Sequence, residues 1–228
     1  MSRYSEIAAN LAAVQSRIAT AAQAVGRATE EIQLIVVTKN FPLSDVEILY
    51  ELGIRNFGEN RDQEGATKSA ELSGDVRWHF QGQIQSRKIK SIGSWAEVIH
   101  SLDSLDHARK FASLTQSRPR EFFVQVNLEP ARVDRGGVPL ESLPQFLSDL
   151  NAESGISPTG LMTVAPVDAP AREAFSTLKE AQRQLINDFP ALTNLSMGMS
   201  GDFEEAIYEG ATHVRVGSSI LGSRGLPA

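Results

Sequence analysis

The chain has 228 residues, of which 41% are hydrophobic, and 28 acidic against 22 basic side chains give a formal net charge of −6. This length and hydrophobic content predict a single folded domain over residues 1–228 and argue against a disordered chain. The acidic excess argues against nucleic acid or an anionic membrane as a partner, because no surplus of basic side chains is available to neutralise phosphates.

The chain contains no cysteine, which excludes disulfides, thiolate metal sites and cysteine nucleophiles. We identify no metal site. Residues 1–26 lack the apolar segment of a signal peptide, and no run of residues approaches the length of a membrane span. We therefore expect a cytoplasmic protein with no membrane partner.

The first predicted element is a helix over residues 5–26, in which Ile7, Leu11 and Val14 fall on one stripe and Gly26 stands at the C-cap. After it, apolar runs alternate with amphipathic stretches. The predicted strands are Leu34–Thr38, Asn56–Glu59, Val76–Gln81, Glu97–Leu102, Phe122–Leu128, Gly160–Val164, Leu195–Met199 and His213–Val216. The predicted helices between and after them lie near 43–52, 61–72, 86–92, 104–116, 141–153, 170–187 and 202–209.

Several of these strands lack period-two alternation, as expected when both faces of a strand are covered. The repeated strand-then-helix order requires parallel pairing. Eight such units predict an α/β fold, a single (β/α)8 TIM barrel with an additional N-terminal helix packed on it. An open doubly wound sheet is the alternative. Residues 129–140 form the longest predicted loop. In such barrels, functional residues lie where the strands end.

Lys39 follows the first strand directly. A lysine at the end of a buried apolar strand is costly unless its ammonium finds a partner or loses its charge. Desolvation lowers a lysine pKa, and the neutral amine is the form that attacks an aldehyde to give a Schiff base. The alternative is a lysine that extends to bulk solvent.

Two Gly-Ser turns follow the last two predicted strands: Ser200 and Gly201 after the seventh, Gly217 and Ser218 after the eighth. Small residues let backbone N–H groups approach the oxygens of an anion. The segment from Ser200 also resembles a helix start, which favours negative charge. Because loops seven and eight are the usual phosphate cradle of this barrel type, we predict a phosphate site there. Ordinary tight turns are the alternative.

Arg215 shares one face of the eighth strand with His213 and Gly217, and we expect this face to point into the barrel. A buried arginine needs a dedicated partner. A pyridine nitrogen would suit it, because arginine only donates and would keep that nitrogen unprotonated. Such a ring is a poor electron sink. The alternative is an internal salt bridge, for instance with Glu59.

Three further positions bear on a cavity. Asn60 ends the second strand and is suited to bind a ring hydroxyl, with an Asx turn as the alternative. His79 lies in the third strand as either a cavity residue or a satisfied core histidine, and an isolated histidine favours the core. Met162 in the sixth strand is suited to contact a flat ring.

Taken together, these segments resemble the pyridoxal phosphate homeostasis protein family, whose fold is that of the N-terminal barrel of alanine racemases. The resemblance covers nearly the whole chain and rests on Val36–Lys39 with Pro42, Asn56–Asn60, Trp78–Gly82 with Gln85 and Lys88, Gly160–Thr163, Leu195–Asp202 and Val214–Gly217. It implies pyridoxal 5′-phosphate (PLP) as the cofactor, bound as a Schiff base on Lys39. It also implies that Ser200, Gly201, Gly217 and Ser218 bind the phosphate and that Arg215 is the partner of the ring nitrogen. The cavity residues that it implies are Asn60, His79 and Met162.

Some positions depart from the family pattern. Gln83 stands where histidine is frequent, Arg87 where asparagine is usual, and Arg135–Gly137 replaces a lysine-containing turn. These changes leave the implied cofactor site intact and put in doubt any partner or nucleotide contact made by those loops.

A racemase needs a second acid/base group opposite Lys39, which two-domain racemases take from a C-terminal domain of a dimer. This chain stops at Ala228, and its tyrosines, Tyr4, Tyr50 and Tyr208, are predicted on helices outside the barrel mouth. We therefore expect a monomeric PLP carrier without robust catalysis. By resemblance, it would act in intracellular PLP (vitamin B6) homeostasis and deliver PLP to apo PLP-dependent enzymes. The alternatives are a small PLP-dependent amino-acid racemase or related PLP enzyme, and a phosphosugar aldolase with Lys39 as its Schiff-base lysine.

Overall fold

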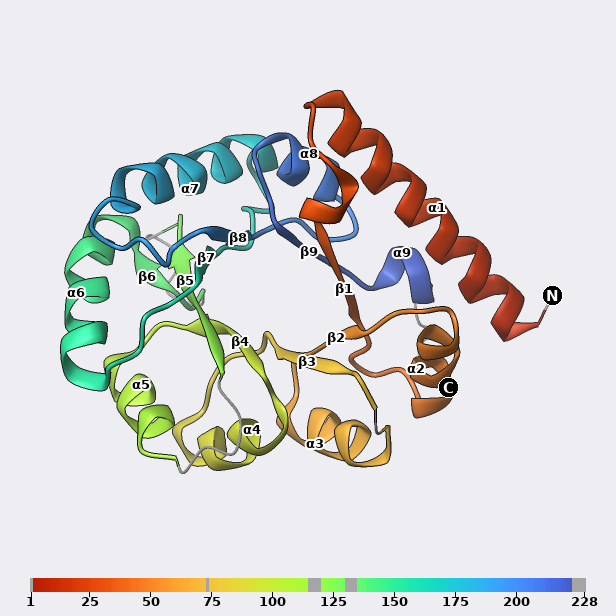
Figure 1. Cartoon of the computed structure of the whole chain (residues 1–228), viewed down its shortest axis with the longest axis horizontal. Coiled ribbons are helices and arrows are strands. Elements are labelled where there is room, and N and C mark those ends of the chain that lie inside the picture. Colours follow the sequence, from red (N-terminus) through yellow and green to blue (C-terminus); the bar gives the residue numbers. More distant parts are fainter. Residues whose placement is uncertain (1, 73, 115–119, 130–134, 223–228) are drawn as a thin grey trace.

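The computed structural model describes residues 2–72, 74–114, 120–129 and 135–222. Eight parallel strands close into a barrel in the order β1, β2, β3, β4, β5, β7, β8 and β9, with β9 pairing back onto β1 (Figure 1). Their bounds are Gln33–Val37, Asn56–Glu59, Arg77–Phe80, Val98–Leu102, Glu121–Asn127, Gly160–Met162, Asn194–Ser196 and His213–Val216. The predicted (β/α)8 barrel is confirmed, and the open sheet is excluded.

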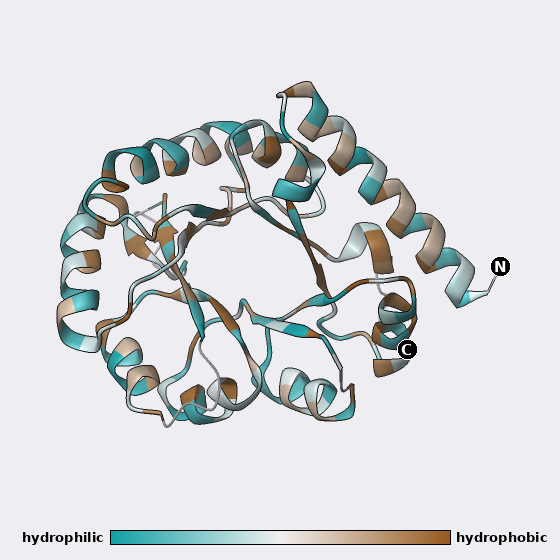
Figure 2. Ribbon diagram, in the orientation of Figure 1, coloured by the Kyte–Doolittle hydropathy of each residue, from teal (hydrophilic) through white to brown (hydrophobic). Residues whose placement is uncertain are grey.

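The helices that follow the strands cover the outside of the barrel (Figure 1). They are α2 (Leu43–Glu51), α3 (Asp62–Glu71), α4 (Ile89–Trp95), α5 (Leu105–Ala112), α6 (Leu143–Ser154), α7 (Ala171–Leu185), α8 (Phe203–Tyr208) and α9 (Ser218–Leu221). Hydrophilic and hydrophobic residues alternate along them, as expected of helices with one side on the barrel and one in solvent (Figure 2). The helix predicted over 104–116 ends at Ala112, and residues 115–116 lie outside the described residues.

The N-terminal helix α1 (Arg3–Ala24) confirms the predicted additional helix. Its buried stripe consists of Ile7, Leu11, Val14, Ile18, Ala21 and Ala22. The helix lies across the outside of the barrel where β1 meets β9 (Figure 1). Arg3 forms an ion pair with Asp45 of α2 at 2.6 Å and donates to the carbonyl oxygen of Leu221 in α9 at 2.9 Å. This helix therefore joins elements from both sides of the barrel closure.

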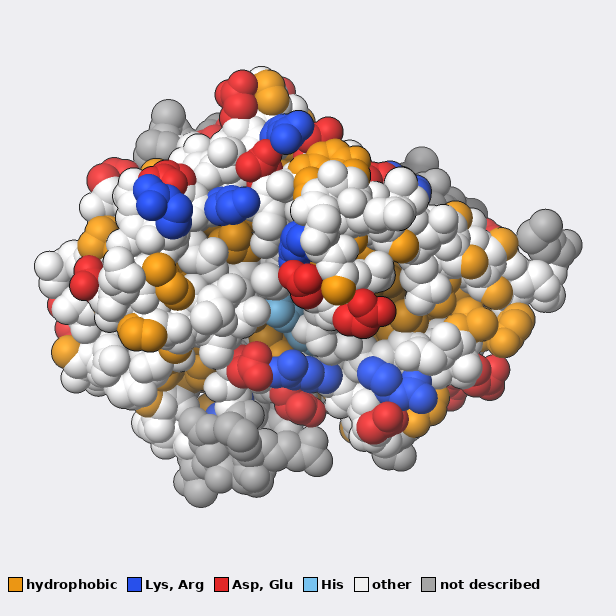
Figure 3. Space-filling view, turned by 45° about the horizontal axis from the view of Figure 1, so that its top comes forward, with side chains coloured by type: hydrophobic (Ala, Val, Ile, Leu, Met, Phe, Trp, Pro, Cys, Tyr) orange, Lys and Arg blue, Asp and Glu red, His pale blue; other side chains and the backbone are white. Residues whose placement is uncertain are grey.

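The long loop predicted over 129–140 contains a short strand, β6 (Val138–Pro139), which pairs in parallel with β5. Residues 130–134 of that prediction are not among the described residues. Within the described ranges, no helix has the length and apolar character needed to cross a bilayer. On the face seen in Figure 3, acidic and basic side chains are interspersed, and a histidine side chain is visible in the central hollow.

The interior of the barrel is partly polar. The buried polar and charged side chains that the strands contribute are Glu59, His79, His100, Ser101, Ser196, His213 and Arg215. A buried polar group costs free energy unless it is hydrogen-bonded, so each of these side chains needs a partner within the protein or in a ligand. Their partners define the site.

Candidate functional site

A cavity of about 480 Å³ opens at the C-terminal ends of the strands, and its size is that of a small-molecule site. The loops that follow β1, β2, β3, β7, β8 and β9 contribute to its walls. The lining residues are Val37, Lys39, Phe41, Asn60, Gln81, Met162, Val164, Met199, Ser200, Gly201, Arg215, Gly217, Ser218 and Gly222. The structure thus brings together all of the predicted site residues except His79.

Lys39 lies at the mouth of this cavity with an exposed side chain. This placement corresponds to the alternative of a lysine that extends toward solvent. The physical reason is that β1 already ends at Val37 and the backbone turns away immediately afterwards, with Asn40 in the left-handed region at φ +66°. The amine is therefore accessible from solvent and from the cavity.

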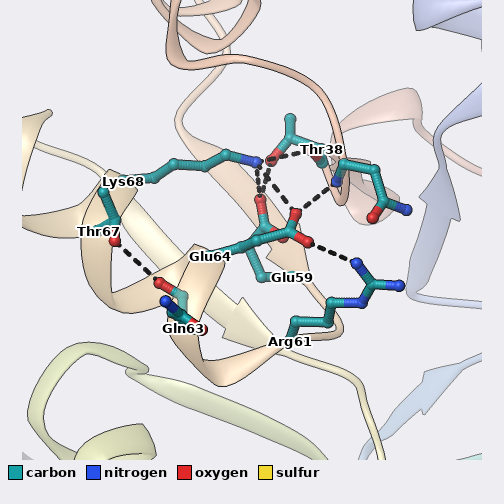
Figure 4. A network of polar contacts seen from close by, with 8 residues as sticks. Thr38, Glu59, Arg61, Gln63, Glu64, Thr67 and Lys68 are labelled. Atoms are coloured by element: carbon teal, nitrogen blue, oxygen red, sulfur yellow. Dashed lines mark hydrogen bonds and ion pairs between the residues drawn. The ribbon is translucent and has the colours of Figure 1, made fainter. Parts of the chain in front are cut away.

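The residue before Lys39 is held by a buried ion pair (Figure 4). Lys68 of α3 donates from Nζ to the carbonyl oxygen of Thr38 at 2.8 Å and to Oε1 of Glu59 at 2.7 Å. The Thr38 hydroxyl donates to the same Glu59 oxygen at 2.6 Å. Burial raises the pKa of the Glu59 carboxyl, and the bonds from Lys68 and Thr38 oppose that rise.

The residue after Lys39 is held by the same helix. The backbone N–H of Asn40 donates to the Glu64 carboxylate, which also forms an ion pair with Arg61 at 3.2 Å (Figure 4). Glu64 lies four residues before Lys68 on α3, and the two side chains approach to 3.8 Å. Helix α3 therefore fixes the backbone on both sides of Lys39.

The two Gly-Ser turns meet across the cavity wall. The N–H of Gly217 donates to Oγ of Ser200 at 3.2 Å, and the Ser219 hydroxyl donates to the carbonyl oxygen of Ser200 at 3.3 Å. Within the described part of the chain, the backbone N–H groups of Ser200, Gly201 and Ser218 donate to no protein acceptor. These groups can receive the oxygens of an anion.

Arg215 is buried in the barrel and lines the floor of the cavity. Its Nη1 donates to Oγ of Ser196 at 2.7 Å and its Nη2 to the carbonyl oxygen of Thr163 at 2.9 Å. Burial lowers the pKa of Arg215 to about 10. Among the described residues no carboxylate forms an ion pair with it, and Glu59, the alternative partner, bonds to Lys68 instead. A guanidinium has five N–H donors, so several remain available to a ligand.

Two polar atoms of cavity residues are buried without a protein partner among the described residues: Oδ1 of Asn60 and Nε2 of Gln81. The Asx turn considered for Asn60 is therefore not formed through that oxygen. An unsatisfied buried donor or acceptor is costly, and a ligand that pairs with it removes the cost. The sequence prediction missed Gln81, although it follows β3 just as Asn60 follows β2.

His79 lies outside the cavity lining. It is fully buried in the barrel, where Nδ1 lies 2.9 Å from Nε2 of His100 and Nε2 lies 3.1 Å from Oδ1 of Asn56. This placement agrees with the alternative that His79 is a buried core histidine whose ring nitrogens both have hydrogen-bond partners. The apolar lining residues Phe41, Val164 and Met199 were also not predicted, because nothing in their residue type distinguishes them from ordinary loop residues.

A second cavity, of about 510 Å³, lies between α3 and α4 near the amino ends of β3 and β4. Trp78, Trp95 and Arg120 contribute to its walls. Among the described residues, its lining shares no member with the cavity at the mouth and includes no lysine, and its Gly93 and Ser94 belong to helix α4 rather than to a turn. The chemistry predicted from the sequence therefore belongs to the cavity at the mouth.

Comparison with known proteins agrees with this architecture. Residues 9–225 match the family model of the alanine racemase N-terminal domain. A protein of Mycobacterium bovis named pyridoxal phosphate homeostasis protein is 40% identical, over 98% of this chain and 95% of its own length. A protein of Escherichia coli K12 with the same name is 32% identical, over 96% and 97%.

Solved structures agree as well. PipY of Synechococcus elongatus, solved without PLP, superposes with a TM-score of 0.84 at 33% identity, covering 95% of this chain and all of PipY. The PLP-bound form of PipY gives a TM-score of 0.83 with the same identity and coverage. This chain belongs to the alanine racemase N-terminal domain family and, within it, to the family of pyridoxal phosphate homeostasis proteins.

Proposed function

We propose that this chain binds PLP in the cavity at the barrel mouth, attached to Lys39, and that it serves PLP homeostasis by holding and delivering the cofactor. The observation that carries the proposal is the convergence of three groups on one cavity: an accessible lysine amine, the free N–H groups of the Gly-Ser turns, and a buried arginine with unused donors. The names of the relatives and the PLP-bound PipY structure support it.

The residues present fit PLP group by group. When bound, PLP supplies an electrophilic aldehyde and an electron-withdrawing ring. The Lys39 amine would be the group that condenses with the aldehyde, with release of water. The free N–H groups of Ser200, Gly201 and Ser218 would hold the phosphate oxygens, and Arg215 would serve the ring nitrogen. Asn60 would accept from the ring hydroxyl through its unpaired oxygen, and Met162 would offer an apolar contact to the ring.

The ionisable groups of the cavity lining support a role without robust catalysis. In the described lining, the ionisable side chains are Lys39 and Arg215, whereas racemisation needs a second acid/base group on the opposite face of the substrate. The tyrosines do not line the cavity, and the hydroxyl of Tyr50, for instance, donates to Asp75 at 3.1 Å. The relatives carry homeostasis names rather than enzyme names, which also supports this role.

Borohydride reduction tests the attachment. Purified protein incubated with PLP is expected to be yellow, and reduction is expected to fix one cofactor mass on the peptide that contains Lys39. The Lys39→Ala variant should take up no label, whereas Lys90→Ala, which removes an exposed lysine outside the cavity, should label like the parent protein. An unmodified Lys39 peptide after reduction would contradict the proposal.

Delivery is tested by transfer from the loaded protein to an apo PLP-enzyme, measured as recovered activity, with Lys39→Ala as the control. A racemase or transaminase turnover above about 1 s⁻¹, the low end of ordinary enzymes, would instead favour the alternative of a small PLP enzyme. A monomeric state and a cytoplasmic location belong to the same proposal. Light scattering after gel filtration and cell fractionation test them.

A further inference from the structure

We infer that Ser196, His100, His79 and Asn56 form a hydrogen-bonded chain of a single polarity that positions Arg215, with both histidines held as neutral Nε2–H tautomers. The chain crosses the barrel interior from the cavity to the amino end of β2. Its members come from four strands, β8, β4, β3 and β2. Its effect on the cofactor rests on the function proposed above, whereas its polarity is a property of the protein alone.

The contacts of this chain are continuous. Nη1 of Arg215 donates to Oγ of Ser196 at 2.7 Å, and that oxygen lies 2.9 Å from Nδ1 of His100. Nε2 of His100 lies 2.9 Å from Nδ1 of His79, and Nε2 of His79 lies 3.1 Å from Oδ1 of Asn56. Ser196, His100 and His79 are all fully buried. In the described structure, each ring nitrogen of the two histidines therefore has one partner within the chain.

The two ends determine the polarity. Arginine only donates, so Ser196 accepts from Arg215, and the Ser196 hydroxyl hydrogen then needs an acceptor of its own. Among the described residues, its other hydrogen-bond partner is His100 Nδ1, which must therefore be unprotonated. The His100 proton then lies on Nε2 and points to His79 Nδ1, and the His79 proton lies on its own Nε2.

The far end of the chain agrees with this direction. Oδ1 of Asn56, an acceptor, receives the His79 Nε2–H and also the Nε2–H of Gln33 at 2.8 Å. Reversing the polarity would place the unprotonated Nε2 of His79 against Oδ1 of Asn56, so that two acceptors would face each other, and it would leave the Ser196 hydroxyl hydrogen without an acceptor. A buried donor without an acceptor is destabilising, so the reversed arrangement is disfavoured.

Both histidines are neutral for a physical reason. Burial lowers the pKa of His79 and of His100 well below the ordinary value, and electrostatic interaction with His213 and Arg77 lowers both further. His79 and Arg215 add to the lowering of the His100 pKa. His100 also stacks on the ring of Phe123, with the centroids 4.5 Å apart and the planes at 9°. The stacking fixes the plane of the His100 ring, and burial together with the neighbouring charges disfavours the protonated form of both histidines.

The chain stabilises Arg215 without neutralising it. Each member directs its acceptor atom toward Arg215 and its hydrogen away from it, so the aligned dipoles favour the buried guanidinium while adding no net charge. A carboxylate in the position of Ser196 would instead form an ion pair and occupy the donors that face the cavity. Ser196 is therefore a positioning residue for Arg215, and His100 and His79 support it.

Nitrogen-15 NMR of the whole protein, without added PLP, tests the polarity directly. The whole protein has 4 histidines, so the spectrum contains few imidazole signals. His79 and His100 are expected to show the shifts of neutral Nε2–H rings throughout pH 6 to 8. A neutral Nδ1–H tautomer in either ring, or protonation of either ring within that range, overturns the inference. This measurement needs no variant and no cofactor.

Substitution tests the positioning role. Ser196→Ala is expected to weaken PLP affinity about tenfold, the size of one hydrogen bond to a charged group, and to shift the visible absorption band of the bound cofactor. Ser101→Ala is the matched control, because Ser101 is also a buried serine but bonds to the carbonyl oxygen of Gly82 outside the chain. It should change the affinity less than twofold. Ser196→Thr keeps the hydroxyl and should restore the parent absorption band.

The outcomes separate this inference from the proposed function. If borohydride fails to label Lys39, the proposed function fails while the tautomer measurement stands. If Lys39 is labelled but Ser196→Ala binds PLP and absorbs like Ser101→Ala, the positioning role is wrong. If Ser196→Ala does not fold, the NMR measurement on the parent protein alone decides the polarity, and Ser196→Thr decides the role through its absorption band.

Discussion

Replacing Lys68 with methionine probes the ion pair that holds the backbone before Lys39. The parent side chain is buried and donates to the Thr38 carbonyl oxygen and the Glu59 carboxylate. Methionine keeps much of the length but removes the charge and the donors. Glu59 is then left as a buried carboxyl whose other oxygen already has no partner in the described structure.

The expected loss is about 3 kcal/mol at pH 7. Removing one partner of a buried ion pair costs about 3–5 kcal/mol, and the lower end applies because Glu59 can take up a proton. Burial already raises the Glu59 pKa, and losing Lys68 raises it further. For a chain of this size, the loss corresponds to a fall in Tm of roughly 6–12 °C.

The Glu59 carboxyl also determines how the stability loss in Lys68→Met depends on pH. A group whose folded pKa lies above its unfolded value contributes stability that is fully present below the unfolded pKa and is lost as the pH rises through the folded pKa. The Lys68→Met variant has the higher Glu59 pKa. Its deficit relative to the parent protein is therefore expected to be smaller at pH 5 than at pH 8.

Thermal and urea unfolding at both pH values measure the deficit. Lys110→Met is the control, because Lys110 forms an exposed ion pair with Asp106 at 2.6 Å whose loss should cost less than about 1 kcal/mol. Adding Glu59→Gln to Lys68→Met should recover part of the loss by removing the buried charge. A Lys68→Met protein as stable as Lys110→Met, or no recovery in the double variant, would refute the reasoning.

Three further predictions concern the turns, the histidines and the arginine. Gly217→Ala should cost about 1–3 kcal/mol of unfolding free energy, measured in urea, because its Cβ would lie 3.0 Å from the Val37 carbonyl oxygen. Gly201→Ala is the control, because its Cβ meets nothing within 4 Å, and it should cost less than about 0.5 kcal/mol. Equal effects of the two substitutions would contradict this account. The free energy of unfolding should fall as the pH drops from 6.5 to 5, because the unfolded chain then binds more protons than the folded protein. The fall should reach up to about 1.4 kcal/mol per pH unit for each histidine whose pKa is lowered by burial. A Tm that does not change over this range would contradict the prediction. The histidines are His79, His100 and His213, the last with a pKa of about 4. Arg215→Lys should weaken PLP binding at least about tenfold in an absorbance titration, because an ammonium cannot bridge Ser196 and Thr163 as the guanidinium fork does; parent-like affinity would exclude that role.

The barrel and most of the residues around the mouth could be predicted because their signals are local. Eight strand-then-helix units require parallel pairing, and parallel strands bring their C-terminal ends to one face. Lys39, Asn60 and the two Gly-Ser turns therefore had to lie near one another once the barrel closed. Gln81 was accessible to the same reasoning, since it also follows a strand, but it carries no unusual chemistry by itself.

The contacts inside the barrel could not be predicted, because they depend on which residues of distant strands share a level. His100 and Ser196 are 96 positions apart and meet only across the barrel. A histidine within an apolar strand looks alike in sequence whether it faces a cavity or another histidine. The residue type alone favoured the core for His79, and it was the family resemblance that placed this residue in the cavity. The exposure of Lys39 could not be decided from the sequence for a related reason: strand ends are uncertain by a residue or two, and β1 ends before Lys39.

The position of helix α1 bears on when the cavity at the mouth can form during synthesis of the chain. Lys39 follows β1, whereas Arg215 belongs to β9 and Gly217 follows it, and these two strands pair only when the barrel closes. A chain emerging from a ribosome thus displays Lys39 long before the opposite wall of the cavity has been synthesised. Helix α1 precedes β1 in the chain, and its contacts with α8 and α9 must wait until those two helices have been synthesised. Helix α1 can therefore dock fully only after α8 and α9 exist, so the ability to bind a ligand at the mouth should arise only after β9 has been synthesised and the barrel has closed.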